Sequence, residues 1–69
     1  MPDNCVKIID CLIEERNKQG KTQRDIAKAT GFSQSVIARF ESKKVIPKLD
    51  TLLKVAAALH KSIAVVSAE

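Results

Sequence analysis

Histidine, cysteine and long apolar runs are scarce or missing in this chain, and each absence excludes a class of site. Its 69 residues include one histidine and two cysteines. Because no cysteine, histidine and acidic residues cluster at ligand spacing, His60 is not expected to hold a metal. No run approaches the roughly 18 apolar residues that a membrane helix needs, and residues 1–10 do not resemble a signal peptide. We therefore expect a cytoplasmic protein with no metal, no cofactor and no membrane partner.

The two cysteines, Cys5 and Cys11, lie on the same predicted helix. Their separation corresponds to about 240° around a helix, so they point apart and cannot be bridged within it. We expect a reduced pair, with an intermolecular disulfide as the alternative. The sequence also shows no nucleophile–base pair, phosphate-binding glycine loop or paired-carboxylate site, and we expect no enzymatic activity.

Positive charge is abundant and unevenly placed. Between residues 16 and 48, nine basic residues stand against two acidic ones, whereas the rest of the chain has three basic and six acidic residues. A lysine-rich stretch is often only a solvated surface. Here it coincides with the motif described below, which favours binding of nucleic-acid phosphates.

Apolar residues recur at steps of three and four, which predicts an all-α fold with helices at about 4–18, 22–30, 33–42 and 49–59. The whole chain, 1–69, makes one domain. A core in a chain below roughly 70–80 residues rarely supplies more than about 3–5 kcal/mol, so a second copy of the chain is expected to add stability. Ile46 is expected to turn inward. The residues of the last helix expected to face the core are Leu49, Leu52, Leu53, Ala56 and Leu59.

Residues 22–41 have the spacing of a helix-turn-helix, the unit that places its second helix in the DNA major groove. Thr22 and Asp25 form a variant of the capping box at the start of the first helix. Gly31 supplies the positive φ of the turn, and Ser33 caps the second helix. The apolar residues of the unit are Ile26, Ala27, Val36, Ile37 and Phe40.

Residues 62–66 change character, because β-branched residues dominate and the period falls towards two. A lone strand in a helical domain needs a partner, and the same strand of a second subunit would supply it. We therefore predict a short dimerisation strand with Ile63, Val65 and Val66 in the interface. The alternatives are a frayed tail and a fifth short helix.

Markers spread over residues 12–59 together resemble the lambda repressor–Cro (Xre-type) helix-turn-helix family. They are Arg16, Thr22-Gln23, Ile26-Ala27, Gly31, Ser33-Gln34-Ser35, Ile37, Glu41, Pro47, Leu52-Leu53, Ala56 and Ala58-Leu59. The resemblance implies a small lambda-repressor-like DNA-binding domain. It also implies that Arg16 and Glu41 pair as a structural brace between the first and third helices.

The resemblance implies that Gln34, Ser35 and Arg39 read base edges. An amide such as that of Gln34 can bond adenine N6 and N7, and the guanidinium of Arg39 can bond guanine O6 and N7. Two alternatives stay open. Gln34 and Ser35 are common first-turn residues, and Arg39 could reach a phosphate instead.

Phosphate contacts are expected from Gln23, Lys43, Lys44 and Lys48. Gln23 stands at the positive end of its helix, where the family clamps a phosphate. Lys48 replaces the usual Ser or Thr cap and opposes the helix dipole, which makes better sense if it faces a phosphate. Lys43 also departs from the family pattern, because it replaces a common glycine after the third helix, and the backbone geometry there stays open.

The leading function is a homodimeric, sequence-specific repressor that binds double-stranded DNA at a palindromic operator through helix 33–42. The alternative is an antitoxin that regulates its own operon and binds a toxin, because the ending AAALHKSIAVV resembles that of HigA- and HipB-type antitoxins. Phage Cro-like proteins, restriction–modification controllers and a scaffold that does not bind DNA also remain open.

Overall fold

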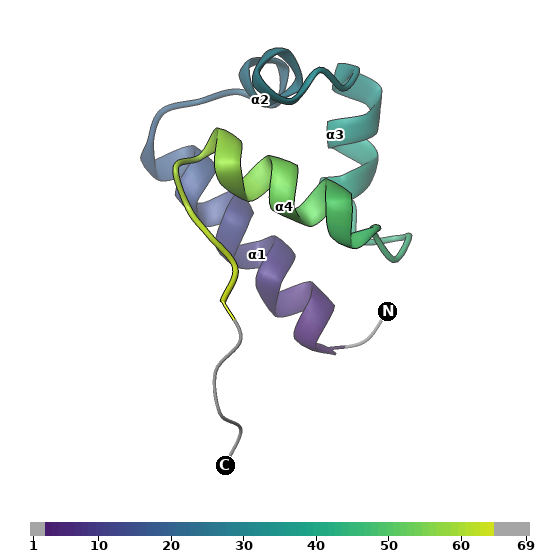
Figure 1. Ribbon diagram of the computed structural model, residues 1–69. Helices are drawn as coiled ribbons and strands as arrows, with labels where there is room; N and C mark the ends of the chain where they lie inside the picture. The colour runs from purple at the N-terminus through teal and green to yellow at the C-terminus, as the bar shows by residue number, and fades with distance from the viewer. Residues whose placement is uncertain (1–2, 65–69) are drawn as a thin grey trace.

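The computed structural model describes residues 3–64, and this part of the chain contains four helices and no strand (Figure 1). The helices are α1, α2, α3 and α4, which span Asp3–Lys18, Gln23–Thr30, Gln34–Glu41 and Leu49–Ala58. The predicted all-α, four-helix fold is confirmed. None of the helices within residues 3–64 is long and apolar enough to cross a membrane.

Local capping explains where α2 and α3 begin. The Thr22 hydroxyl accepts a hydrogen bond from the Asp25 backbone N–H, and the Asp25 carboxylate accepts one from the Thr22 N–H, which completes a capping box. The Ser33 hydroxyl accepts from the Val36 N–H. Because Thr22 and Ser33 have extended φ and ψ angles, each helix starts one residue later than its predicted range.

A left-handed glycine makes the turn between α2 and α3. Gly31 has a φ of 81°, and its N–H donates to the Ala27 carbonyl to close the last turn of α2. This conformation strains residues with a Cβ atom, so glycine suits the position. As a result α3 leaves α2 at a steep angle and stands at the edge of the molecule (Figure 1).

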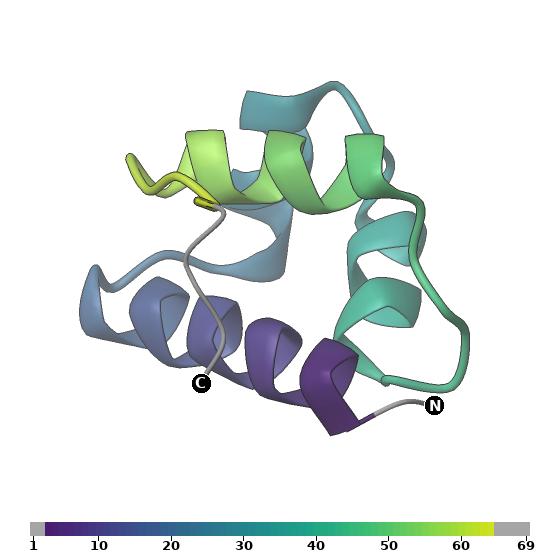
Figure 2. The same ribbon diagram turned by 60° about the horizontal axis from the view of Figure 1, so that its bottom comes forward.

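The core lies where the four helices meet, with α1 on one side and α4 on the other, joined by α3 at one end (Figure 2). The helix α2 packs on both α3 and α4, and α1 also packs on both. Four large side chains of the core are almost completely buried. They are Ile9, Ile26, Ile37 and Leu59.

The inward orientation predicted for Ile46, Leu49 and Leu53 is wrong. Their exposed fractions are 67%, 64% and 44%. Leu53 lies about 100° around α4 from Leu52, which faces the core, so it falls beside the buried stripe. The loop between α3 and α4 carries Ile46 into solvent, and these three side chains form an exposed apolar surface at the start of α4.

Two residues other than glycine have positive φ, Lys43 with 61° and His60 with 59°. Lys43 follows the end of α3, and His60 follows the end of α4, so both take the place that glycine usually has after a helix. The backbone at Lys43 therefore keeps the shape that a glycine would have there, at a conformational cost.

Residues 61–64 form no regular element, and Ile63 is half-buried against the core. Ile63 lines a shallow groove with Ile8, Cys11 and Leu12 of α1. The predicted dimerisation strand runs on to Val65 and Val66, which lie outside the described residues. In the described part, Ile63 packs on its own chain.

Candidate nucleic-acid interface

The helix α3 buries Ile37 and Phe40 and turns its opposite face to solvent. The three side chains predicted to read bases, Gln34, Ser35 and Arg39, are all exposed. Arg39 lies one turn beyond Ser35, so both point away from the core on neighbouring positions of one face. The outward face of α3 is therefore open to a partner, and it carries Val36, which is 42% exposed, beside these polar side chains.

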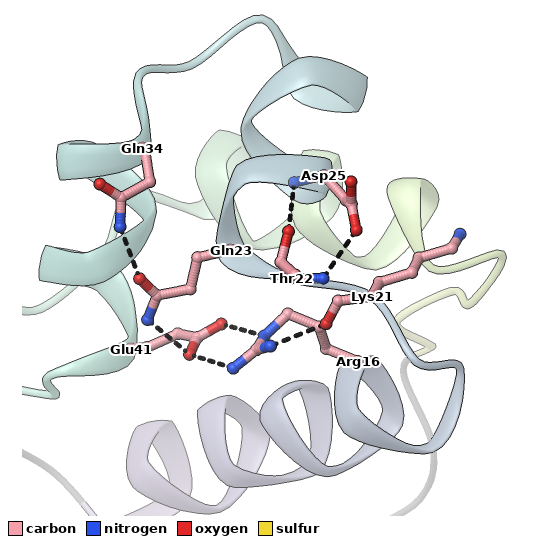
Figure 3. Close-up of polar contacts among 7 residues, drawn as sticks. All are labelled: Arg16, Lys21, Thr22, Gln23, Asp25, Gln34 and Glu41. Atoms are coloured by element: carbon pink, nitrogen blue, oxygen red, sulfur yellow. Dashed lines mark hydrogen bonds and ion pairs between the residues drawn. The ribbon is translucent and has the colours of Figure 1, made fainter.

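Gln34 is exposed and held in place by a hydrogen bond. Its side-chain Nε2 donates to Oε1 of Gln23, the first residue of α2, over 2.8 Å (Figure 3). This bond joins the first residues of the two helices on either side of the turn. A side-chain amide has two donors and two acceptor sites, so Gln34 keeps one N–H and its Oε1 for another partner.

Gln23 is in turn held by the brace of Arg16 and Glu41. The guanidinium of Arg16 donates to both carboxylate oxygens of Glu41, over 2.7 and 2.9 Å, and Gln23 Nε2 donates to the Glu41 Oε1 over 3.0 Å. The third Arg16 bond goes to the Lys21 carbonyl over 2.8 Å. The side chains of Arg16 and Glu41 are only 14% and 12% exposed, so the pair is well shielded from water. Figure 3 shows the chain of contacts from α1 to the start of α3.

The start of α2 already holds one negative charge, that of the Asp25 carboxylate. The hydrogen bonds that Asp25 accepts from Thr22, first that of the backbone N–H, hold the pKa of its carboxyl below the usual range. An ionised carboxylate is favourable at a helix N-terminus for the same reason that a bound phosphate is. An open depression lies beside this terminus, lined by residues that include Gln23, Gln34, Lys21 and Arg24.

Lys21 and Arg24 are two basic residues beside the candidate interface that our sequence-based assignment left out. Both line this depression, and Arg24 is exposed. The Nζ of Lys21 lies 3.4 Å from the Ala58 carbonyl oxygen, so this lysine also ties the loop before α2 to α4. Their closeness to Gln23 in the sequence was the available signal.

The remaining predicted phosphate contacts lie at the other end of α3. Arg39 and Lys48 line one depression between α3 and the start of α4. Lys48 caps α4 with its backbone alone, and its side chain makes no capping bond. Lys44 is exposed. Lys43 differs from the others, because its Nζ forms an ion pair with Asp10 of α1.

No three His, Cys, Asp or Glu side chains within residues 3–64 are grouped so that they could hold a metal ion. The chemistry of the site is therefore that of amide, hydroxyl, guanidinium and ammonium groups. Such groups suit phosphate oxygens and base edges.

A helix-turn-helix family model matches residues 12–66, which is most of the chain. The chain belongs to this helix-turn-helix family. The match covers all of α2, α3 and α4 and the second part of α1. It bears out the resemblance on which the site residues above were chosen.

Two similar proteins extend this result. The chain is 38% identical over 61 residues to a protein from Haemophilus influenzae described as an uncharacterized HTH-type transcriptional regulator, covering 88% of this chain and 62% of that one. It therefore spans less than two thirds of that relative. A solved structure titled "Toxin-Antitoxin module from Streptococcus pneumoniae" matches with a TM-score of 0.80 and 49% identity, over 97% of this chain and 74% of that chain.

Proposed function

We propose that this protein is a sequence-specific DNA-binding transcriptional regulator that binds as a homodimer to a palindromic operator and represses transcription. The helix α3 enters the major groove, where Gln34, Ser35 and Arg39 contact base edges. Gln23, Lys43, Lys44 and Lys48 bind phosphates on either side. The family match and the Haemophilus influenzae regulator support a DNA-binding regulator over an enzyme.

The observation that carries this proposal is the outward face of α3. Polar side chains that suit base edges are exposed there, and the first of them is held by Gln23. Basic side chains flank this face at both ends, with Arg24 in the first turn of α2, and Lys44 and Lys48 in the loop between α3 and α4. Side chains that can contact bases lie between two groups of basic side chains. This arrangement complements the DNA major groove, which has base edges on its floor and phosphates along both sides.

Salt dependence of DNA binding tests the proposal. With about 6–10 phosphate contacts in a dimer, affinity should fall by about 10³–10⁵ between 50 and 200 mM salt. Fluorescence anisotropy with a duplex selected from random DNA measures this directly. An affinity that stays flat over that range would sink the proposal.

Dimerisation would place two α3 helices about 34 Å apart, one turn of DNA per half-site. Two surfaces could form the interface. One is the predicted strand with Ile63, Val65 and Val66, and the other is the exposed apolar surface of Ile46, Leu49 and Leu53.

One pair of matched substitutions separates the two interfaces. If the strand forms the dimer, Val65→Asp gives monomers and Leu53→Asp leaves dimers in analytical ultracentrifugation. The reverse result assigns the dimer to the apolar surface at the start of α4. Monomers in the unsubstituted protein at all concentrations would contradict the homodimer.

A second function, that of an antitoxin, is favoured by the match to the Streptococcus pneumoniae toxin–antitoxin module. In this case the protein would regulate its own operon and also bind a toxin. The test is to express the product of the neighbouring gene with and without this protein. Growth arrest that this protein relieves, with a stable complex on size-exclusion chromatography, supports the antitoxin role. A neighbouring product that is harmless alone and does not bind contradicts it.

A further inference from the structure

We propose that Glu41 is a positioning residue that sets the base preference of Gln34, through the amide of Gln23. This inference rests on the proposed DNA-reading role of Gln34. It goes beyond the brace with Arg16, because it assigns Glu41 an effect on which base is preferred rather than on how firmly the helices are held.

The first step is the polarity of the Gln23 amide. An ionised carboxylate only accepts hydrogen bonds, so Glu41 Oε1 must face an N–H group. The Gln23 Nε2 lies 3.0 Å from that oxygen, and the Gln23 Oε1 therefore points the other way. If the amide were flipped, two acceptor oxygens would face each other in a place largely shielded from water. Glu41 thus holds the amide in one of its two orientations.

The second step passes this polarity to Gln34. Because Gln23 presents its Oε1, which is an acceptor, Gln34 has to donate a hydrogen bond to it. The Gln34 Nε2 does so over 2.8 Å. The groups of Gln34 that remain free are its Oε1 and one N–H. An acceptor beside a donor complements adenine, which shows the N6 donor and the N7 acceptor in the major groove.

The opposite polarity would favour a different base. A flipped Gln23 amide would present its N–H groups, and Gln34 would answer with its Oε1. Gln34 would then keep both of its N–H groups for DNA. Two donors complement guanine, which shows two acceptors, O6 and N7. The charge of Glu41, two residues away along this chain of hydrogen bonds, therefore decides between an adenine-type and a guanine-type pattern.

Two matched substitutions separate positioning from bracing. Glu41→Gln has nearly the same shape but can accept or donate, so both polarities of Gln23 become available. Arg16→Gln breaks the same ion pair but leaves the Glu41 carboxylate as an acceptor. Both variants weaken the pair between Arg16 and Glu41, but only Glu41→Gln lets the Gln23 amide adopt either orientation.

The measurement is the ratio of affinities for adenine and guanine at the position that Gln34 reads, which is the one where Gln34→Ala flattens the preference. Circular dichroism gives the unfolding temperature of each variant, and the anisotropy titrations are run below it. We expect Glu41→Gln to reduce the adenine-to-guanine ratio by about fivefold or more. Arg16→Gln should leave the ratio within about twofold of the original, since a structural loss lowers affinity for all bases alike.

Equal changes of the ratio in the two variants, or no change in either, would overturn the positioning role and leave Glu41 as a brace. If Gln34→Ala changes no base preference, the reading role of Gln34 fails and this inference fails with it. If neither the protein nor any variant binds DNA, the proposed function itself is wrong. These three failures are distinct.

Nitrogen-edited NMR of the free protein gives a readout that needs no DNA. In the original protein, one side-chain N–H of Gln34 and one of Gln23 should exchange slowly with solvent. Glu41→Gln should reduce this protection at Gln34, whose N–H groups are no longer bonded to Gln23 in the flipped orientation, whereas Arg16→Gln should keep it. Fast exchange of the Gln23 and Gln34 amides in the original protein would contradict the inference.

Discussion

Two ion pairs hold α3, and they differ in how far water reaches them. Glu41, the last residue of α3, pairs with Arg16 and is joined through Gln23 to Gln34 at the start of the helix, and the side chains of this pair are 14% and 12% exposed. Lys43, two residues after the end of α3, pairs with Asp10, and these side chains are 34% and 52% exposed. The first pair is shielded and hydrogen-bonded to its neighbours, and the second is open to water and to salt.

This difference indicates two tasks in DNA binding. A reader must present its donors and acceptors in one arrangement, because a base edge accepts only one pattern. A phosphate contact needs charge and reach, and it works in many orientations. The side chains joined to the shielded pair therefore suit base recognition, and the exposed basic side chains after α3 suit sequence-independent affinity.

Removing one cation from each ion pair tests the difference between them and should give the largest effect. Arg16→Met should cost about 3 kcal/mol of unfolding free energy, because a shielded carboxylate is left without its partner. Lys43→Met should cost at most about 1 kcal/mol, since its pair is exposed. Urea unfolding measures both values. Equal losses would show that the two ion pairs stabilise the fold alike.

A side chain on the outward face of α3 that contacts one base should affect the preference at that base position alone. Arg39→Ala should cost about 1–3 kcal/mol in discrimination at that position and leave the other positions unchanged. Competition titrations with single-base variants of the selected site give the value. A uniform loss on all DNA sequences would mean that Arg39 contacts a phosphate.

The matched control is Lys44→Ala, in the exposed loop after α3. It should weaken binding to every sequence alike and reduce the slope of log affinity against log salt by about one. Titrations at four salt concentrations determine the slope. A change of base preference in this variant would contradict the division of tasks.

A smaller effect separates backbone strain from DNA contact at one residue. Lys43 has a left-handed φ of 61°, so Lys43→Gly should be more stable by about 0.5–1 kcal/mol than Lys43→Met, which loses the same pair with Asp10. The same change should weaken DNA binding if this lysine reaches a phosphate. Thermal unfolding and anisotropy measure the two effects. Unchanged DNA affinity in both variants would remove Lys43 from the interface.

The smallest effect concerns pH at the start of α2. Because the pKa of Asp25 is lowered in the fold, its capping contribution is present above the unfolded pKa of about 4. The contribution is lost as pH falls through the lower folded value. The stability difference between the original protein and Asp25→Asn should therefore shrink from pH 6 to pH 2.5 in urea unfolding. A constant difference would argue against the carboxylate cap.

The features that the sequence predicted well are local. The capping box of Thr22, the cap at Ser33 and the turn at Gly31 depend on residues within one or two turns, and the structure contains all three. The pairing of Arg16 with Glu41 followed from the family resemblance, and the two side chains do meet.

The features that the sequence missed depend on packing between distant segments. Gln23 meets Glu41 only because α2 crosses the end of α3, and Lys43 meets Asp10 only because α1 runs below the same end. The exposure of Leu49 likewise depends on how the loop before α4 leaves α3. Apolar spacing places a residue on a face of its helix, but it does not say how wide the buried face is. The roles of the reading and phosphate-binding residues stay predictions.

Selection of bound duplexes from random DNA tests the central claim most directly. The claim predicts enrichment of an inverted repeat whose half-sites lie about 10–10.5 base pairs apart, centre to centre. It further predicts that Gln34→Ala and Arg39→Ala each lose the preference at a different position of the half-site. No enriched sequence, or one whose preferences survive both substitutions, would contradict DNA reading by α3.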